Sequence, residues 1–335
     1  MKQKLKFSTK KGKYIPYFDF IKGIAILMVI AIHTTTSCNL DSTNGILSTI
    51  IRQCFNCAVP IFLACSAYFL ASTNLSTFSN CWRFWKKQIP KVYIPTLIWS
   101  IPILITNIYS GGHPISEIIY YLICGYSIYY FIALIIQYYL LLPILKKYRK
   151  TVLYLSIPIT IISLLYFTKV SITNPLPLII GGGPFNMWLL YFMIGVCLSF
   201  SKRAYKLTLP ITLIILGIIA QFAEVVYLEN VYNNLRLGIK ASSVLYSSGI
   251  ILILFSKKLE DSYRNNFITS ATEYLGKKSF IIYLCHCYFI DVIYRIYHTN
   301  FWSINFILSL ILTIIFVFIL EKITPKPIQK YIGLK

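Results

Sequence analysis

Ten mostly apolar segments, each close to the length of a bilayer-spanning helix, alternate with short polar segments in this chain of 335 residues. A helix needs about 20 mostly apolar residues to cross the hydrocarbon core of a bilayer, with about 17–25 observed. The segments are 15–36, 46–72, 91–109, 119–145, 151–168, 186–201, 207–223, 240–256, 279–294 and 303–321. We therefore expect an all-α integral membrane protein with about ten transmembrane helices, forming a single domain over residues 1–335.

The composition supports this fold class and excludes others. Only 13% of the residues are charged, against about 25% in a typical soluble domain. The net charge is nevertheless +22, with 32 Lys and Arg against 10 Asp and Glu. A nucleic-acid-binding protein carries such an excess on a soluble surface, whereas here the basic residues lie between apolar segments. We therefore expect the lipid bilayer as a partner, and no nucleic acid.

The basic residues are concentrated in every second polar segment between the ten apolar segments. Lys and Arg gather in the cytoplasmic loops of membrane proteins. If the N-terminus is cytoplasmic, 26 of the 32 basic residues fall on the cytoplasmic side, five fall on the opposite side, and Lys22 lies inside the first segment. This distribution predicts that both termini are cytoplasmic.

The fourth segment, 119–145, is too long for one simple span. We expect an irregular or re-entrant piece near Gly125. Such backbone is tolerated at membrane depth only where it is buried in protein or lines a cavity.

The first segment carries the strongest candidates for function, because ionisable residues inside a membrane span are costly and are functional candidates by default. Lys22 and His33 are eleven residues apart, which places them on one helix face, about 16 Å apart along the axis. Asp19 precedes Lys22 by three residues and can pair with it. One face thus carries a cation toward the cytoplasm and an acid–base group near the outer surface.

Each of these residues also has a purely structural interpretation. Lys22 can extend its ammonium group to the cytoplasmic interface, and His33 can be a satisfied interfacial residue beside the threonines at 34–36. His286 falls near the middle of the ninth segment and needs a hydrogen-bond partner there. In the structural interpretation, this hydrogen bond only holds two helices together. The basic stretch 83–91 is either ordinary positive-inside charge or a phosphate site. The histidines lack ligand spacing, so no metal site is expected.

The motifs around these residues resemble those of the acyltransferase 3 family of bacterial membrane O-acyltransferases. The family has a basic residue, ten others and a histidine in its first span, and this chain has DFIKGIA at 19–25 followed by His33. This chain also has VPIFLACSAYF at 59–69 and KKQIPKVYIP at 86–95, which correspond to the family's second and third spans. Further matches are YFIAL at 130–134, YFMIG at 191–195 and SFIIYLCH at 279–286.

The chain also departs from the family pattern. Ala67 stands where a glycine is usual, Lys22 replaces an arginine, and the usual pair of arginines before the third span is reduced to Gln88 and Lys91. SIYY at 127–130 lacks a common second histidine and is closer to the relatives encoded with intercellular adhesin. AIHTTT at 31–36 is similar to the O-acetyltransferases of enterobacterial common antigen.

The resemblance implies a multi-pass enzyme of the bacterial inner membrane. It would transfer an acyl group, with acetyl favoured, from cytoplasmic acyl-CoA to a hydroxyl of a surface polysaccharide or its lipid-linked precursor. Lys22, Lys87 and Lys91 would hold the phosphates of acetyl-CoA. His33 would act as general base or as acyl carrier, on the helix face that also carries Lys22 with its partner Asp19. The hydroxyls of Ser66 and Tyr130, with Tyr68, would orient the thioester or its oxyanion.

Two other function classes stay open. A polysaccharide exporter or flippase would use the same polar interior as a sugar path, and the relatives of the intercellular-adhesin type are described either as exporters or as O-succinyltransferases. A solute transporter with a proton relay through His33 and His286 is the third class, but no inverted repeat is visible in the sequence.

Overall fold

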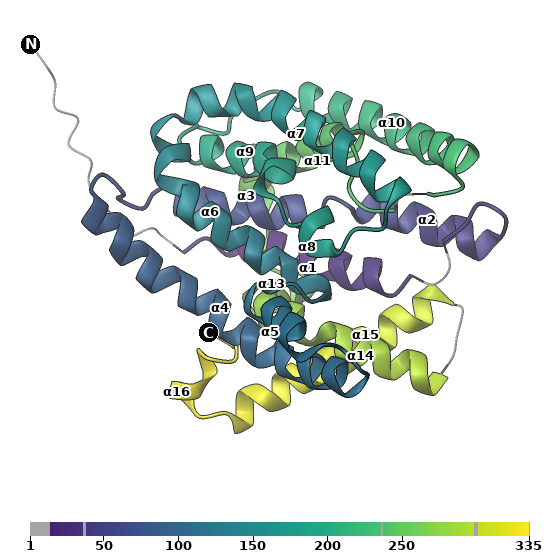
Figure 1. Ribbon diagram of the computed structural model, residues 1–335. Coiled ribbons are helices and arrows are strands. Elements are labelled where there is room, and N and C mark those ends of the chain that lie inside the picture. Colours follow the sequence, from purple (N-terminus) through teal and green to yellow (C-terminus); the bar gives the residue numbers. More distant parts are fainter. Residues whose placement is uncertain (1–13, 36–37, 236, 298–300, 335) are drawn as a thin grey trace, which may run out of the picture.

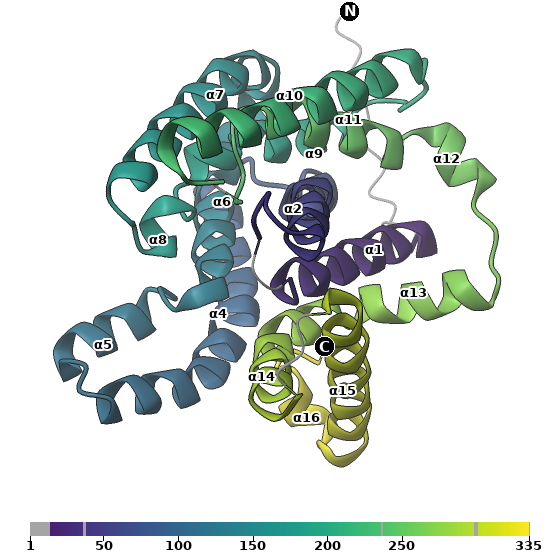
Figure 2. The ribbon, with the colours of Figure 1, turned by 90° about the vertical axis from the view of Figure 1, so that its right-hand side faces the viewer.

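Figures 1 and 2 show the computed structural model of the chain, which describes residues 14–35, 38–235, 237–297 and 301–334. Within these ranges every regular element is a helix. The N-terminal stretch 1–13 with its six lysines, Thr36, Arg236 and His298 lie outside the described residues.

The elements follow one another along the chain as sixteen α-helices and two short 3-10 helices within the described ranges. They are α1 (Pro16–His33), α2 (Thr43–Phe55), α3 (Ala58–Leu70), α4 (Phe78–Tyr109), α5 (Pro114–Leu122), η1 (Ser127–Tyr129), α6 (Tyr130–Lys147), α7 (Arg149–Thr173), α8 (Leu178–Gly181), η2 (Phe185–Trp188), α9 (Leu189–Ser199), α10 (Thr208–Tyr232), α11 (Ser243–Leu254), α12 (Lys257–Ser262), α13 (Phe267–Lys277), α14 (Ser279–Tyr297), α15 (Trp302–Ile323) and α16 (Lys326–Gln329).

Eight helical segments in the described part of the chain are long and apolar enough to cross a membrane. Two shorter apolar segments, Phe185–Ser199 and Ser243–Leu254, lie where the sixth and eighth spans are expected. The expectation of an all-helical membrane protein is thus confirmed, while the count of ten spans and the orientation of the termini stay predictions.

The surface of α15 has the polarity that lipid requires. Its polar residues Ser309 and Thr313 are fully buried, whereas Ile307, Ile311 and Ile315 are each about half exposed. Water-soluble helices place their apolar stripe inward and their polar face outward. The reversed arrangement on α15 indicates an apolar surrounding medium.

The second expected span is one helical segment with a break. α2 ends at Phe55 and α3 begins at Ala58. Pro60 explains the break, because it lacks the N–H that would bond the carbonyl of Asn56 and its ring clashes with that carbonyl. The interruption leaves Asn56 and Cys57 as a short joint between the two halves.

The fourth expected span is also interrupted, which confirms the irregular piece predicted near Gly125. α5 ends at Leu122, and α6 begins only at Tyr130. In between, Cys124 and Ser127 have φ values of 55° and 40°, in the left-handed region that non-glycine residues rarely adopt. The apolar helical segment therefore covers Ser127–Lys147 instead of 119–145, and α5 is a separate short helix.

The basic stretch before the third span is helical instead of a loop. α4 begins at Phe78, where the Thr77 side chain accepts a hydrogen bond from the backbone N–H of Asn80 at 3.3 Å. With 32 residues, the helix is about 48 Å long, well beyond the hydrocarbon thickness. Its first turns therefore carry the basic residues, and its later turns form the apolar part.

Helix α1 occupies the centre of the bundle, with α13 beside it and α2 close by, as Figure 2 shows. It packs against α3 on one side and against α14 on another.

The approach of α1 to α13 is unusually close. A Cβ on Gly23 would lie 2.0 Å from the Thr272 carbonyl oxygen, and one on Gly276 would lie 1.7 Å from the Asp19 carbonyl oxygen. Glycines at both positions let the two backbones touch, and this contact fixes the part of α1 that carries Asp19 and Lys22.

Candidate active site

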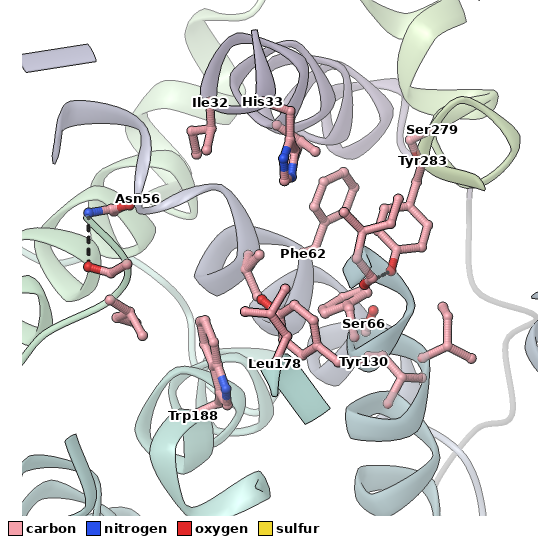
Figure 3. Close-up of a pocket in the computed structure, with 18 of the residues that line it drawn as sticks. Ile32, His33, Asn56, Phe62, Ser66, Tyr130, Leu178, Trp188, Ser279 and Tyr283 are labelled. Atoms are coloured by element: carbon pink, nitrogen blue, oxygen red, sulfur yellow. Dashed lines mark hydrogen bonds between the residues drawn. The ribbon is translucent and has the colours of Figure 1, made fainter. Parts of the chain in front are cut away.

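A cavity of about 410 Å³ lies where α1, the α2–α3 break, α6 and α14 meet. Val92 of α4, Ile128 of η1, Leu178, Trp188 and residues 237–239 also line it. Figure 3 shows side chains from these separate segments converging on one space. The lining is largely apolar with a few polar groups, which is typical of small-molecule and cofactor sites.

Lys22 and His33 both line this cavity, as the eleven-residue spacing predicts. The expected pairing of Asp19 with Lys22 is also present, with 2.5 Å between the carboxylate and Nζ. Tyr14 donates its hydroxyl proton to the other carboxylate oxygen at 2.7 Å. Asp19 itself does not line the cavity, so it contributes to the site through its ion pair with Lys22.

His33 projects from the last turn of α1 into the cavity, as Figure 3 shows. Among the described residues, none makes a hydrogen bond to either of its ring nitrogens. Its closest aromatic neighbour is His286 on α14, with 5.4 Å between the ring centroids and 54° between the ring planes. The imidazole of His33 is therefore available to a ligand.

His286 is fully buried, and its hydrogen bonds determine its tautomer. Nδ1 lies 2.8 Å from the Tyr283 carbonyl oxygen and 3.1 Å from that of Ile282. A carbonyl oxygen only accepts, so Nδ1 carries the proton in the neutral ring and Nε2 is the acceptor. Nε2 faces the Cys287 thiol at 3.5 Å. These partners belong to α14 itself. The structural alternative, a hydrogen bond from His286 to a second helix, is therefore not what these contacts show.

Ser66 and Tyr130 also line the cavity. No hydrogen bond to either hydroxyl is present among the residues that the structure describes, so both can serve a ligand. Tyr68 differs, because its ring stacks on Phe18 with 4.7 Å between the ring centroids and does not line the cavity. Its place is in the packed core.

The basic residues of α4 lie apart from this cavity. Lys87 and Lys91 are exposed and are not lining residues. Neighbouring Lys86 has its ammonium group 5.0 Å from the centre of the Trp82 ring. Val92 is the α4 residue in the lining, so the helix reaches the site beyond its basic part.

Two lining residues near the α2–α3 break, Arg52 and Asn56, are not among the site residues predicted from the sequence. From the sequence, Arg52 is expected on the outer side, in a polar cleft together with Glu224, Glu229, Arg236 and Lys240. Arg52 lines the cavity, whereas Glu224, Glu229 and Lys240 do not. Asn56 reaches the Gly238 carbonyl oxygen at 3.5 Å, as drawn in Figure 3. No sequence pattern pointed to Asn56, because its exposure to the cavity depends on the break that Pro60 causes.

The described residues contain no group of three or more His, Cys, Asp or Glu side chains that could hold a metal ion. The residues that line the cavity carry one imidazole on His33, two cationic groups on Lys22 and Arg52, and five hydroxyls, on Ser66, Tyr130, Tyr139, Ser279 and Tyr283.

Comparisons with known proteins give one match. A family model described as an acyltransferase domain matches residues 15–322, which include every lining residue of the cavity. No curated protein and no solved structure matches the chain.

Proposed function

The chain belongs to the acyltransferase family whose domain spans residues 15–322, and from this premise we propose that it moves an acyl group from cytoplasmic acyl-CoA to a sugar hydroxyl. The acceptor is a cell-surface polysaccharide or its lipid-linked precursor, and acetyl is the favoured acyl group. The protein acts in the inner membrane of a bacterial cell with both termini in the cytoplasm. The family supports membrane acyl transfer in general, and the finer assignments are our proposal.

One observation carries this proposal. His33 and Lys22 line the same cavity, and neither ring nitrogen of His33 is used by a described residue. A cation at one end of the helix face suits the phosphates of the donor, and an unbonded imidazole about 16 Å further along the axis suits the reacting thioester.

The reaction step follows from these positions. The acceptor hydroxyl oxygen attacks the carbonyl carbon of the thioester while His33 removes the hydroxyl proton. The carbon–sulfur bond then breaks, and the proton passes from His33 to the departing CoA thiolate. The products are the sugar ester and free CoA. In the alternative route, His33 first carries the acyl group covalently and then passes it to the hydroxyl.

The remaining predicted residues have supporting roles in this scheme. The hydroxyls of Ser66 and Tyr130 donate to the carbonyl oxygen, which becomes negative as the hydroxyl attacks. Asp19 holds Lys22 in place through their ion pair. Lys87 and Lys91 extend the positive charge for the donor on the exposed surface of α4.

The role of Lys22 gives a first prediction. Lys22→Ala should raise the KM for acyl-CoA by roughly 10–100-fold, because hydrogen bonds to charged groups contribute about 1.5–3 kcal/mol. Steady-state kinetics with a fixed acceptor measure this. Lys22→Arg should restore most of the affinity, and Lys258→Ala, at an exposed lysine on α12, is the matched control. An unchanged KM in Lys22→Ala would remove Lys22 from the donor site.

The function itself is tested with purified protein in vesicles, radiolabelled acetyl-CoA and a glycan acceptor. We expect labelled ester on the glycan and release of CoA in equal amounts. The same assay with succinyl-CoA tests the O-succinyltransferase alternative. If no acyl group is transferred from any donor while lipid-linked glycan crosses the vesicle membrane, the protein is an exporter and the enzyme proposal is wrong.

A further inference from the structure

Arg52 is a cation in the wall of the cavity, and it forms no ion pair with a residue that the structure describes. It lies in the last turn of α2, where the negative end of the helix dipole gives partial compensation. Its Nη1 donates to the Thr35 hydroxyl oxygen at 3.3 Å, whereas its Nε is buried without a hydrogen-bond partner. One edge of the guanidinium is therefore unused.

No Asp or Glu side chain neutralises this charge. All ten Asp and Glu residues lie in the described ranges, and none of their ion pairs involves Arg52. The titratable side chains near Arg52 are those of Cys38, Tyr294 and His33, and side chains of these types carry no negative charge at neutral pH with their ordinary pKa values. Lys22, by contrast, already has Asp19.

The location of Arg52 associates it with the reacting group. It lines the same cavity as His33 and donates a hydrogen bond to the hydroxyl of Thr35, which follows His33 by two residues. Lys22 lies on the same helix as His33 but about 16 Å away along the axis. A ligand that spans the cavity therefore meets Lys22 at one end and Arg52 beside His33 at the other.

We propose that Arg52 binds a carboxylate that the ligand carries close to the group being transferred. This inference rests on the proposed function. An arginine fork binds a carboxylate through two parallel hydrogen bonds, and such a ligand would use the unoccupied Nε edge. A buried cation lacking a partner is costly, and a carboxylate from the ligand removes that cost only while the ligand is bound. Arg52 thereby selects an acidic substrate over a neutral one.

The carboxylate has two possible sources, the acyl chain of the donor or the sugar of the acceptor. For the donor, binding of succinyl-CoA and butanoyl-CoA is compared by calorimetry, because both acyl chains have four carbons and only the first ends in a carboxylate. For the acceptor, acetyl-CoA is held constant and the KM for a uronic acid glycoside is compared with that for the neutral glycoside. Each comparison uses the wild-type protein and Arg52→Gln.

We expect the wild type to prefer the acidic member of one pair by roughly 10–100-fold, and Arg52→Gln to lose that preference. Arg52→Lys should retain part of it, because lysine keeps the charge without the fork. Arg295→Gln, at an exposed arginine outside the cavity lining, is the matched control and should keep the full preference.

Three outcomes would overturn the inference: no preference in either pair for the wild type, a preference unaffected in Arg52→Gln, or an equal loss in Arg295→Gln. The donor comparison measures binding and needs no turnover. A carboxylate-dependent affinity in a protein that transfers no acyl group would therefore contradict the proposed function alone, and acyl transfer without any preference would contradict the Arg52 inference alone.

Discussion

His33→Ala should lower the rate of acyl transfer by about 10²–10⁴-fold, the usual contribution of a positioned general base. The ring nitrogens of His33 make no hydrogen bond to a described residue, so its removal deletes no contact of that kind from the fold. The side chain faces the cavity, so its loss enlarges an existing space. We therefore expect the variant to keep its melting temperature in detergent while losing turnover.

The control for this variant is His113→Ala, which removes an exposed imidazole at the start of α5. It should transfer acyl groups at the wild-type rate. A His33→Ala protein that is as active as the wild type would refute the catalytic assignment. The two routes through His33 are separated by rapid quenching after mixing with labelled donor alone, because only the carrier route leaves label on the protein.

The second large effect is expected at the contact between α1 and α13. Gly276→Ala should reduce the free energy of unfolding by about 1–3 kcal/mol or more, as overpacking does. The added Cβ would lie 1.7 Å from the Asp19 carbonyl oxygen, and backbone cannot move away as a flexible side chain can. The direction of this change is informative, because replacing glycine by alanine inside a helix normally raises the free energy of unfolding by about 1 kcal/mol.

Thermal unfolding in detergent, followed by size-exclusion chromatography of the heated samples, measures this loss. Gly181→Ala is the matched control, because a Cβ there would meet its nearest neighbour, the Leu176 Cβ, at an ordinary 3.5 Å. We expect Gly181→Ala to unfold as the wild type does. If Gly276→Ala were equally stable, α1 and α13 would not be in the close contact described above.

The sequence predicted those features that depend on neighbours along the chain. The helical pitch alone placed Lys22 and His33 on one face and Asp19 within reach of Lys22, and both results are confirmed. The excessive length of 119–145 indicated the interruption near Gly125, which is present. Boundaries were less accurate, since α4 extends through the basic stretch that was expected to precede the span.

The sequence could not predict which distant residues meet. His286 lies far from His33 in the chain, yet their rings are 5.4 Å apart, and the partners of His286 proved to be in its own helix. The sequence indicated a polar outer cleft that includes Arg52, but not that Arg52 lies in the wall of the His33 cavity without an ion pair to a described residue. Its environment depends on the packing of α1, α2 and α14, which no local pattern encodes.

The sequence by itself thus determined that this is a helical membrane protein with a cation and a histidine in register on its first span, because membrane thickness and helical pitch are fixed lengths. Only the tertiary structure decided that Ser66 and Tyr130 share the cavity with His33, while Lys87 and Lys91 stay outside it. The physical reason is that contacts between helices depend on local breaks and on close approaches, such as the one between α1 and α13, which set how each helix lies against the next.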